Sequence, residues 1–422
     1  MLLPFLAIAA AVLQVGDGRA YRRIEEAVAA AKPGDTIEVY PSAVGYAGSA
    51  IMIRKPRLTI RGIGEKRIVL DGGTFDYSGE GRIPRAIFQA DPQAEGTKIE
   101  HFELRGAHNG SYNGAGVRIN QASNVTVSDC DIHGDDMGIM SNGRTGDPHA
   151  SENQLITHCA IHGNGNLKDP GYNHNLYLGG TSVTVEFSDI YASLTGHNLK
   201  SRAHFNLVRH CYIHDSANRE CDFVEAWDTE RPNSNAVLIG NVIAKDPNCH
   251  GNRMTIHFGQ EKGQRNGALF LLADTIVTPF LSPVVELSSS KAELNMYSNI
   301  VVNVQESHPL LVEATNGANP DNVVGAGNWI SSGYDLRTLH RIGPTYTGLN
   351  SRKNPLRPDL TLNLSALDEE RKAWETGKSD MPFLTHFLTN YTDGDGNSID
   401  FGIDYRFDGK EWVHGSPRFG AG

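Results

Sequence analysis

The sequence has few aromatic residues, few cysteines and a shortage of basic side chains. Aromatic residues make up 8% of the 422 positions, and lysine plus arginine (38) number fewer than aspartate plus glutamate (49), so the formal net charge is −11. A general nucleic-acid binder needs a broad basic surface, which this balance disfavours. The sequence also lacks an apolar run of the roughly 20 residues that a membrane helix needs. We therefore expect no nucleic-acid partner and no membrane insertion. A local basic site is still compatible with this composition.

The N-terminus is apolar and uncharged. The stretch MLLPFLAIAAAVLQ has an apolar core and an Ala-x-Ala pattern at Ala7 to Ala9, which indicates a signal peptide over residues 1–12. No lysine or arginine precedes the core, so a buried first strand is the alternative interpretation. A signal peptide predicts a secreted or periplasmic protein, whose five cysteines would meet an oxidising environment.

A repeat of short apolar segments runs through the middle of the chain, with successive segments 23 to 33 residues apart. Alignment of the segments gives two columns. The first column holds Cys130, Cys159, Ser188, Cys211, Asn241, Asp274 and Asn299. The second column holds Ile132, Ile161, Ile190, Ile213, Ile243, Ile276 and Val301. The period is too short for a strand–helix–strand unit, and it predicts a parallel β-helix in which each repeat forms one coil of short strands.

Because the two columns lie two residues apart, both face the interior of the coil. The three cysteines of the first column then belong to an interior stack of small and amide side chains and are structural thiols. A Cys130–Cys159 disulfide is disfavoured by the geometry of facing parallel strands. Between the columns runs an outward set, which we interpret as a solvated stripe rather than a metal site because a tyrosine interrupts it: His133, His162, Tyr191 and His214.

The segment YRRIEEAVAAAKPGDTIEVYPS places Ile24, Ala27 and Val28 at helical spacing before a turn and a strand, which predicts a short helix that caps the open end of the coil. With LTIRGIGEKRIVLDGG after it, this segment resembles the opening of the pectin lyase-like superfamily of right-handed parallel β-helices. The resemblance covers residues 13 to 303. It implies an all-β solenoid with an N-terminal capping helix. After Asn303 the regular columns fade, so we expect an irregular tail over 304–422 that packs back on the coil. The superfamily holds lyases, hydrolases, epimerases and non-catalytic adhesins, so the fold does not select an activity.

The predicted tail contains one calcium-like pattern. DGDGNSID (393–400) has three Ca²⁺-type positions, but Ser398 replaces the usual turn glycine and no bidentate glutamate follows. We interpret it as a plain turn.

A further strand precedes the columns in each repeat, and its outward-facing residues predict the functional face. An outward ladder holds Arg118, Met140, Tyr177, Lys200, Glu225, His257 and Glu286. Beside it lie Arg202 and Trp227, and just before it lie His174, Asn175, His197 and Asn198. A solvated sheet face ordinarily carries Thr, Ser, Lys and Glu, whereas these side chains match a groove for a sugar chain. We therefore predict substrate binding by His174, Asn175, Asn198, Glu225, Trp227 and His257.

These residue types suit β-elimination from a uronate, which needs a cation or hydrogen-bond donors at the carboxylate, a base for the C5 proton and an acid for the leaving oxygen. We predict that Arg202 holds the carboxylate and lowers the pKa of Lys200, which then acts as the base. His197 is the competing base, and Tyr177 donates or relays a proton. The alternative interpretation is an exposed basic strand.

LKSRAHFNLVRHCYIHD resembles the Lys-Ser segment of chondroitinase B and the family 6 alginate lyases. Lys200 and Ser201 match the segment. The resemblance implies a lysine base, an assisting arginine on the next coil and acidic Ca²⁺ ligands just upstream. Glu225 stands where the family has that arginine, and SLT (193–195) stands where it has the calcium-binding acids. We therefore expect no definite cofactor, because matching Ca²⁺ ligands are missing.

The sequence thus predicts a monomeric, secreted lyase of an acidic polysaccharide. A glycoside hydrolase is an alternative, because GDDMGI resembles the paired aspartates of polygalacturonases at Asp135 and Asp136, and hydrolysis needs two carboxyl groups across the bond. Glu225 with Asp222 or Asp228 is a further acidic pair. A uronate epimerase in the same groove and a non-catalytic carbohydrate-binding adhesin are the remaining alternatives.

Overall fold

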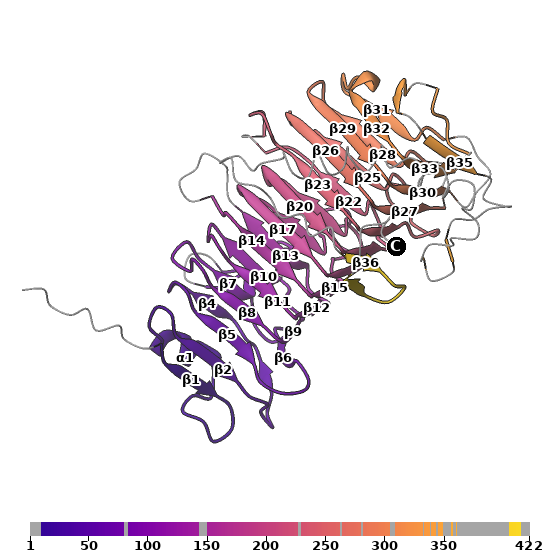
Figure 1. Cartoon of the computed structure of the whole chain (residues 1–422). Coiled ribbons are helices and arrows are strands. Elements are labelled where there is room, and N and C mark those ends of the chain that lie inside the picture. The colour runs from indigo at the N-terminus through magenta and orange to yellow at the C-terminus, as the bar shows by residue number, and fades with distance from the viewer. Residues whose placement is uncertain are drawn as a thin grey trace, which may run out of the picture.

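A computed structural model of the chain describes residues 10–79, 83–142, 150–226, 229–261, 264–279, 282–303, 309–331, 333–337, 339–342, 345–348, 356–357, 360 and 405–414. Three long parallel sheets run along one axis, and from β2 to β35 consecutive strands fall on different sheets (Figure 1). This is the coil architecture that the repeat predicts, a parallel β-helix. Among the described residues, no helix is long and apolar enough to cross a membrane.

Sheet A carries the first strand of each coil. Its strands are β1 (Val12–Val15), β2 (Thr36–Val39), β5 (Thr59–Gly62), β8 (Lys98–Glu100), β11 (Thr126–Ser128), β14 (Gln154–Thr157), β17 (Ser182–Glu186), β20 (Phe205–Arg209), β23 (Ala236–Ile239), β26 (Gly267–Leu272), β29 (Ala292–Tyr297), β32 (Val323–Ala326) and β34 (Arg341–Ile342).

Sheet B follows after a sharp turn. Its strands are β3 (Tyr46–Ala47), β6 (Ile68–Asp71), β9 (Phe102–Arg105), β12 (Asp131–His133), β15 (Ala160–His162), β18 (Asp189–Tyr191), β21 (Tyr212–His214), β24 (Val242–Ala244), β27 (Thr275–Thr278), β30 (Ile300–Asn303), β33 (Asn328–Ser331) and β35 (Thr345–Gly348).

Sheet C carries the face on which the functional residues are predicted. Its strands are β4 (Ile51–Ile53), β7 (Ala86–Ala90), β10 (Ala115–Asn120), β13 (Met137–Asn142), β16 (Leu176–Leu178), β19 (Leu199–Ser201), β22 (Cys221–Phe223), β25 (Ile256–Gly259), β28 (Val285–Ser288) and β31 (Val312–Ala314).

The two ends of the coil differ. At the N-terminal end, helix α1 (Ile24–Ala30) lies beside β1 and β2 (Figure 1) and buries Ile24, Ala27 and Val28. At the other end the sheets continue past the predicted boundary at Asn303, through β31 to β35, with a 3-10 turn η1 (Pro320–Asn322). An antiparallel hairpin, β36 (Tyr405–Phe407) and β37 (Trp412–His414), packs on sheet B, where Trp412 Nε1 donates to the Gly240 carbonyl at 2.9 Å. The signal-peptide segment up to residue 9 and the DGDGNSID pattern lie outside the described residues.

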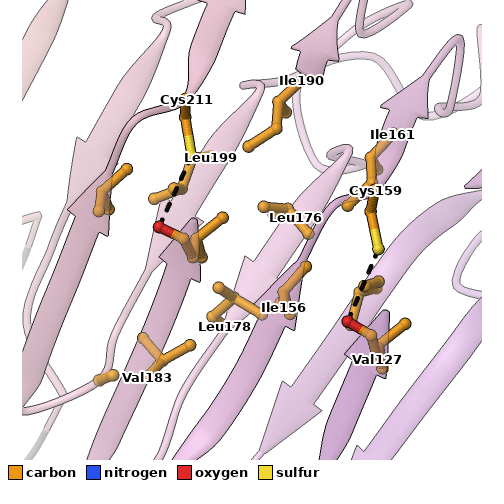
Figure 2. Close-up of a cluster of buried hydrophobic side chains, with 14 of the residues drawn as sticks. Val127, Ile156, Cys159, Ile161, Leu176, Leu178, Val183, Ile190, Leu199 and Cys211 are labelled. Carbon is orange, nitrogen blue, oxygen red and sulfur yellow. Dashed lines mark hydrogen bonds between the residues drawn. The ribbon is translucent and has the colours of Figure 1, made fainter. Parts of the chain in front are cut away.

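The interior contains both predicted columns. Every member of the two columns is buried, and the coils after them add Asn328 and Ile330. Cys159 and Cys211 each donate from Sγ to a carbonyl of the previous coil at 3.6 Å, the carbonyls of Val127 and Val185 (Figure 2). All five cysteines are free and buried, so Cys130 and Cys159 form no disulfide.

The first column continues as an amide ladder in the C-terminal half of the coil. Asn241, Asn299 and Asn328 each donate from Nδ2 to a carbonyl of the previous coil at 2.8–3.0 Å. Asn299 also donates to Asn328 Oδ1 at 2.8 Å, and Asn241 donates to Asp274 Oδ1 at 2.9 Å. Asp274 interrupts this ladder because a carboxylate has no proton to donate. Burial raises the pKa of Asp274 to about 7.

The outward histidine stripe on sheet B forms a stack of rings. Adjacent centroids from His133 through His162 and Tyr191 to His214 lie 4.5–5.1 Å apart. Carboxylates accompany the stripe: Asp131 contacts His162, and Asp189 contacts His214, each at 3.1 Å. Within the described ranges no three His, Cys, Asp or Glu side chains are placed to hold one metal ion.

Asp274→Asn is expected to stabilise the coil most at alkaline pH. The folded pKa of Asp274 lies above its unfolded value, so its contribution to stability is fully present below about pH 4 and is lost as pH rises to about 7. The amide removes this titration and supplies the missing donor. Thermal melting should show a melting temperature raised by about 2 °C or more at pH 8 and by less at pH 5. Asn299→Asp is the matched control and should show the opposite trend; equal shifts at both pH values contradict the assignment.

Candidate active site

The candidate site lies on the outer face of sheet C and centres on Lys200 of β19. Register places Tyr177 of β16 beside Lys200 on one side and Asp222 of β22 on the other, followed by His257 and Glu286. The prediction of Glu225 at the Asp222 position is therefore wrong. Phe223 lies opposite Ser201 with its side chain fully buried, so this strand begins earlier than the apolar residues Val224 and Ala226 suggested.

Asp222 is the fully buried anion of the site. Its Oδ2 lies 3.0 Å from Lys200 Nζ and 3.2 Å from His197 Nε2, and its Oδ1 lies 2.7 Å from His257 Nδ1 and 3.4 Å from Arg219 Nη1. Burial acts to raise the pKa of Asp222, but His197, His257 and Lys200 outweigh it and hold the pKa well below its usual value. Asp222 therefore stays ionised and fixes the Lys200 ammonium on the sheet face.

His197 and His257 position this carboxylate, because their ring nitrogens are already bonded. The Arg219 backbone N–H donates to His197 Nδ1 at 3.1 Å, so the neutral ring carries its proton on Nε2, facing Asp222. Burial lowers the pKa of His197 to about 4. His257 faces Asp222 through Nδ1 and Ser288 Oγ through Nε2 at 2.5 Å. These contacts argue against His197 as the base and against His257 as a direct substrate ligand.

Lys200 is charged in the free protein, contrary to the prediction that Arg202 supplies a neutral amine. Burial acts to lower the pKa of Lys200, but the Asp222 and Glu261 carboxylates outweigh it and raise the pKa above its ordinary value. The Lys200 side chain is 9% exposed and forms an ion pair with Glu261 as well as with Asp222. The predicted low pKa of Lys200 was wrong because the prediction considered the Arg202 cation and not the carboxylates of Asp222 and Glu261.

The side chains of Arg202 and Lys200 both contact the carboxylate of Glu261. Glu261, in the loop after β25, contacts Lys200 through Oε1, and its Oε2 lies 2.6 Å from Arg202 Nη2. Arg202 Nε also donates to the Tyr177 hydroxyl at 3.0 Å, and Nη1 to the Glu225 carbonyl at 2.5 Å. Burial acts to lower the pKa of Arg202, but Tyr177 and Glu261 raise it further above its ordinary value. The two cations and the phenol thus form one connected group, as predicted for Lys200, Arg202 and Tyr177.

The predicted binding residues occupy different environments. His174 stacks on His197 with centroids 5.0 Å apart and meets Tyr177 edge-on at 5.4 Å. Its Nδ1 accepts from the His197 backbone N–H at 3.0 Å, so the neutral ring carries its proton on Nε2. Glu225 is nearly buried, and its Oε2 accepts from the Glu261 backbone N–H at 2.5 Å. Glu225 therefore holds the Glu261 loop. Trp227 and Asp228 lie outside the described residues.

Asn175 and Asn198 belong to the interior of the coil. Both are fully buried and link neighbouring coils: Asn175 donates to Asn198 Oδ1 at 2.8 Å, and Asn198 donates to Glu220 Oε2 at 2.6 Å. Each amide also donates to a backbone carbonyl at 2.7 Å. Because these donors are bonded inside the protein, the structure corrects their predicted role: they support the turn before the site and do not face a bound saccharide.

The paired aspartates of the hydrolase alternative are also buried. Asp135 Oδ1 accepts from the Ala107 backbone N–H at 2.7 Å, and burial raises the pKa of Asp135 well above its usual value. Asp136 accepts from the Asn109 backbone N–H at 2.9 Å and from Asn166 Nδ2 at 2.8 Å. Both side chains are 0% exposed, so they hold loops together and present no pair of carboxyl groups to a glycosidic bond. Asp222, proposed as a partner for Glu225, is equally buried.

The residues of the site do not fit a resident Ca²⁺ ion. Calcium takes six to eight oxygen ligands, but the Asp222 oxygens face lysine, histidine and arginine nitrogens. In the part of the chain that the structure describes, no three His, Cys, Asp or Glu side chains are arranged to hold a metal. The Lys200 ammonium occupies the position between Asp222 and Glu261 that a bridging cation would need.

Sequence reasoning missed Arg219 and Glu261, and it considered Asp222 only as an acidic partner of Glu225. Arg219 forms ion pairs with Asp222 at 3.4 Å and Glu286 at 2.6 Å, and the alternation Arg219, Cys221, Phe223 could have signalled an earlier strand. Glu261 reaches back over 61 positions to Lys200 from a loop, where strand periodicity carries no information.

No protein-family model and no curated protein matches the sequence. Similar solved structures include pectate lyase Pel9A, which is 12% identical with a TM-score of 0.45 over 99% of this chain and 97% of that chain. Carrot pectin methylesterase is 12% identical with a TM-score of 0.37, over 80% and 88% of the two chains. The tailspike gp49 of Acinetobacter baumannii bacteriophage Fri1, a capsular polysaccharide depolymerase, is 10% identical with a TM-score of 0.49; the match spans 80% of this chain and 62% of the tailspike.

Identities this low concern the fold alone. The three parallel sheets of the chain itself give it the architecture of a parallel β-helix.

Proposed function

We propose that this protein is a secreted lyase that cleaves an acidic, uronate-containing polysaccharide by β-elimination. The observation that supports it most is the pair of cations, Lys200 and Arg202, that together hold the single carboxylate of Glu261 beside the Tyr177 hydroxyl. A uronate offers the same carboxylate next to an acidic C–H bond and a leaving oxygen. The proposal includes export of the protein, for which the N-terminal pattern is the support, and the burial of all five thiols suits an oxidising compartment.

The Glu261 carboxylate marks the position of the substrate carboxylate. It is 39% exposed and is carried on a loop rather than on the sheet, so a uronate can displace it without disturbing the coil. Arg202 then neutralises the charge that develops when the C5 proton leaves, because a guanidinium stays protonated and pairs with both carboxylate oxygens. Fixed donors aimed at developing charge are usually the largest contribution to catalysis.

Lys200 is the proposed base. In its neutral form the amine takes the C5 proton while the C4–O bond breaks and the C4–C5 double bond forms. Tyr177 gives its proton to the leaving oxygen, because its own oxygen already accepts from Arg202 and its proton is free to donate. The guanidinium then faces the phenolate that results. Asp222 and its imidazole neighbours keep the Lys200 nitrogen in place through both proton states.

Turnover should appear as ultraviolet absorbance from unsaturated chain ends when the protein is incubated with a panel of uronate polysaccharides. Lys200→Ala should lower kcat by about a thousandfold, as expected for loss of a general base, with unchanged circular dichroism. Lys98→Ala, at an exposed position of sheet A, is the matched control and should retain activity. New reducing ends without absorbance would indicate hydrolysis, and binding without turnover across the panel would indicate an adhesin; either result refutes the lyase.

The pH dependence should identify the ionisation state in which Lys200 works. Its carboxylate neighbours raise its pKa above the ordinary value, so the neutral base is scarce at pH 7 and becomes about tenfold more abundant per pH unit below that pKa. kcat/KM should therefore rise through the alkaline range until the protein unfolds. A plateau near neutrality followed by an alkaline decline would show instead that the lysine acts as a cation.

Glu261→Gln should tighten substrate binding, because it removes the anion that competes with the substrate for Lys200 and Arg202. We expect KM for the polymer to fall by about three- to tenfold, the effect of one charge-assisted hydrogen bond. The alkaline rise of kcat/KM should also move to lower pH, since Lys200 loses one of its carboxylates. Glu293→Gln, at an exposed position of β29, is the control. An unchanged KM with a lower kcat would place Glu261 in the chemistry rather than in competition.

A further inference from the structure

The outer face of sheet C carries another arginine group, away from Lys200. Arg118 lies on β10 in the same outward ladder, and register connects it through Met140 and Tyr177 to Lys200. Three strand spacings separate the Arg118 and Lys200 positions, about 14 Å. This distance exceeds a single sugar ring, so one ligand that touches both must be an oligosaccharide or a polymer.

Arg118 has an unusual environment for a cation. Its described contact is from Nη1 to the Met140 sulfur at 3.1 Å, and a thioether is a weak acceptor. Arg85 lies nearby: its Nη2 donates to Asn113 Oδ1 at 2.7 Å, while its Nε is buried without a hydrogen-bond partner. Among the described residues neither guanidinium forms an ion pair with a carboxylate. Burial and the neighbouring Arg85 charge lower the pKa of Arg118 to about 10, as expected for a cation that lacks its anion.

Asp91, the carboxylate whose charge acts on Arg118, is already occupied. Asp91 Oδ2 binds Arg54 Nε at 2.7 Å, and its Oδ1 accepts from Gln89 at 2.8 Å and Asn120 at 3.3 Å. The donors of Arg85 and Arg118 therefore keep capacity for an external anion.

The surface between the two cationic groups is apolar. Met140 and Tyr177 pack against a small cluster formed by Ala86, Ala115 and Met137. An aromatic and thioether floor suits the apolar face of a sugar ring, while the guanidinium and ammonium groups at its two ends suit carboxylates.

The opposite direction along the ladder is acidic. After His257 come Glu286, which is paired with Arg219, and Glu313 on consecutive strands. Like charges repel a polyanion there, whereas Arg118 attracts it. The charge pattern therefore directs an acidic chain from Lys200 toward the N-terminal coils.

We propose that Arg118 and Arg85 form a second anion subsite, which binds a carboxylate or sulfate group of an acidic polysaccharide several sugar units from the bond that is cleaved. The position of the cleaved bond rests on the proposed lyase function, but the subsite itself is a binding site and can be tested without turnover.

The test compares Arg118→Gln and Arg85→Gln with wild type by calorimetric titration and by initial rates on polygalacturonate, alginate, hyaluronate and chondroitin sulfate. We expect binding of the preferred polymer to weaken about tenfold in each variant, and kcat/KM to fall by a similar factor. The shortest oligosaccharide that is cleaved should lose less than twofold, because it does not reach Arg118. Arg61→Gln, on the exposed face of sheet A, is the matched control and should behave as wild type.

A further variant separates binding from folding. Arg118→Met should leave the melting temperature unchanged or raised, because an unpaired, partly buried cation does not stabilise the fold. A clear loss of melting temperature would show that Arg118 is structural and would overturn the proposal. Unchanged polymer binding in Arg118→Gln would overturn it as well, even if the lyase activity is present. If no polymer is cleaved but one binds through Arg118, the lyase fails and the subsite stands; if none binds, both proposals fail.

Discussion

In-register stacking of parallel strands is the constraint on which the rest of this structure depends. Each coil places its residues directly above their counterparts, so a side chain interacts mainly with its own position one coil away. In the interior this produces ladders in which a thiol or an amide donates to a carbonyl of the previous coil, as at Cys211 and Asn299. On the outer face the same stacking brings Tyr177, Lys200 and Asp222 together, although they come from separate repeats.

Stacking also explains how a buried charge is tolerated at the site. A single carboxylate inside a sheet stack would cost several kcal/mol without partners. Asp222 has its partners on the neighbouring strands and the adjoining turns: Lys200 and His197 before it, His257 after it. Each partner is held by its own strand or turn, so the arrangement needs no reorganisation when a ligand arrives. The rigid part of the site is thus built from the coil, and the displaceable anion, Glu261, is supplied by a loop.

The sequence predicts the repeating part of this molecule and not its exceptions. The interior columns from Cys130 to Asn299 have a fixed parity, and strand periodicity alone assigns them. The same periodicity places Tyr177 beside Lys200 and Arg202. It fails at Asp222, because CDFVEAW can be read with two alternating patterns. Hydrophobicity favours the later pattern, with Val224 and Ala226 facing inward, but in the structure Phe223 is buried and sets the earlier one. It also fails for Asn175 and Asn198, since an amide looks the same in sequence whether it bonds to a sugar or to the next coil. The Glu261 contact depends on the path of a loop, which no periodicity encodes.

The charge balance at Lys200 links substrate binding to proton transfer. In the free protein the ammonium faces two carboxylates, of which Asp222 is fixed and Glu261 is displaceable. A uronate that replaces Glu261 substitutes one carboxylate for another, so the electrostatic environment of the lysine changes little on binding. If Lys200 is the base, as proposed, little binding energy is used to change its ionisation, and Lys200 must lose its proton to solvent before catalysis. Arg202, which contacts the same carboxylate and the Tyr177 hydroxyl, keeps its charge throughout. In the proposed mechanism the permanently charged arginine binds the substrate carboxylate, and the titrating lysine removes the proton beside it.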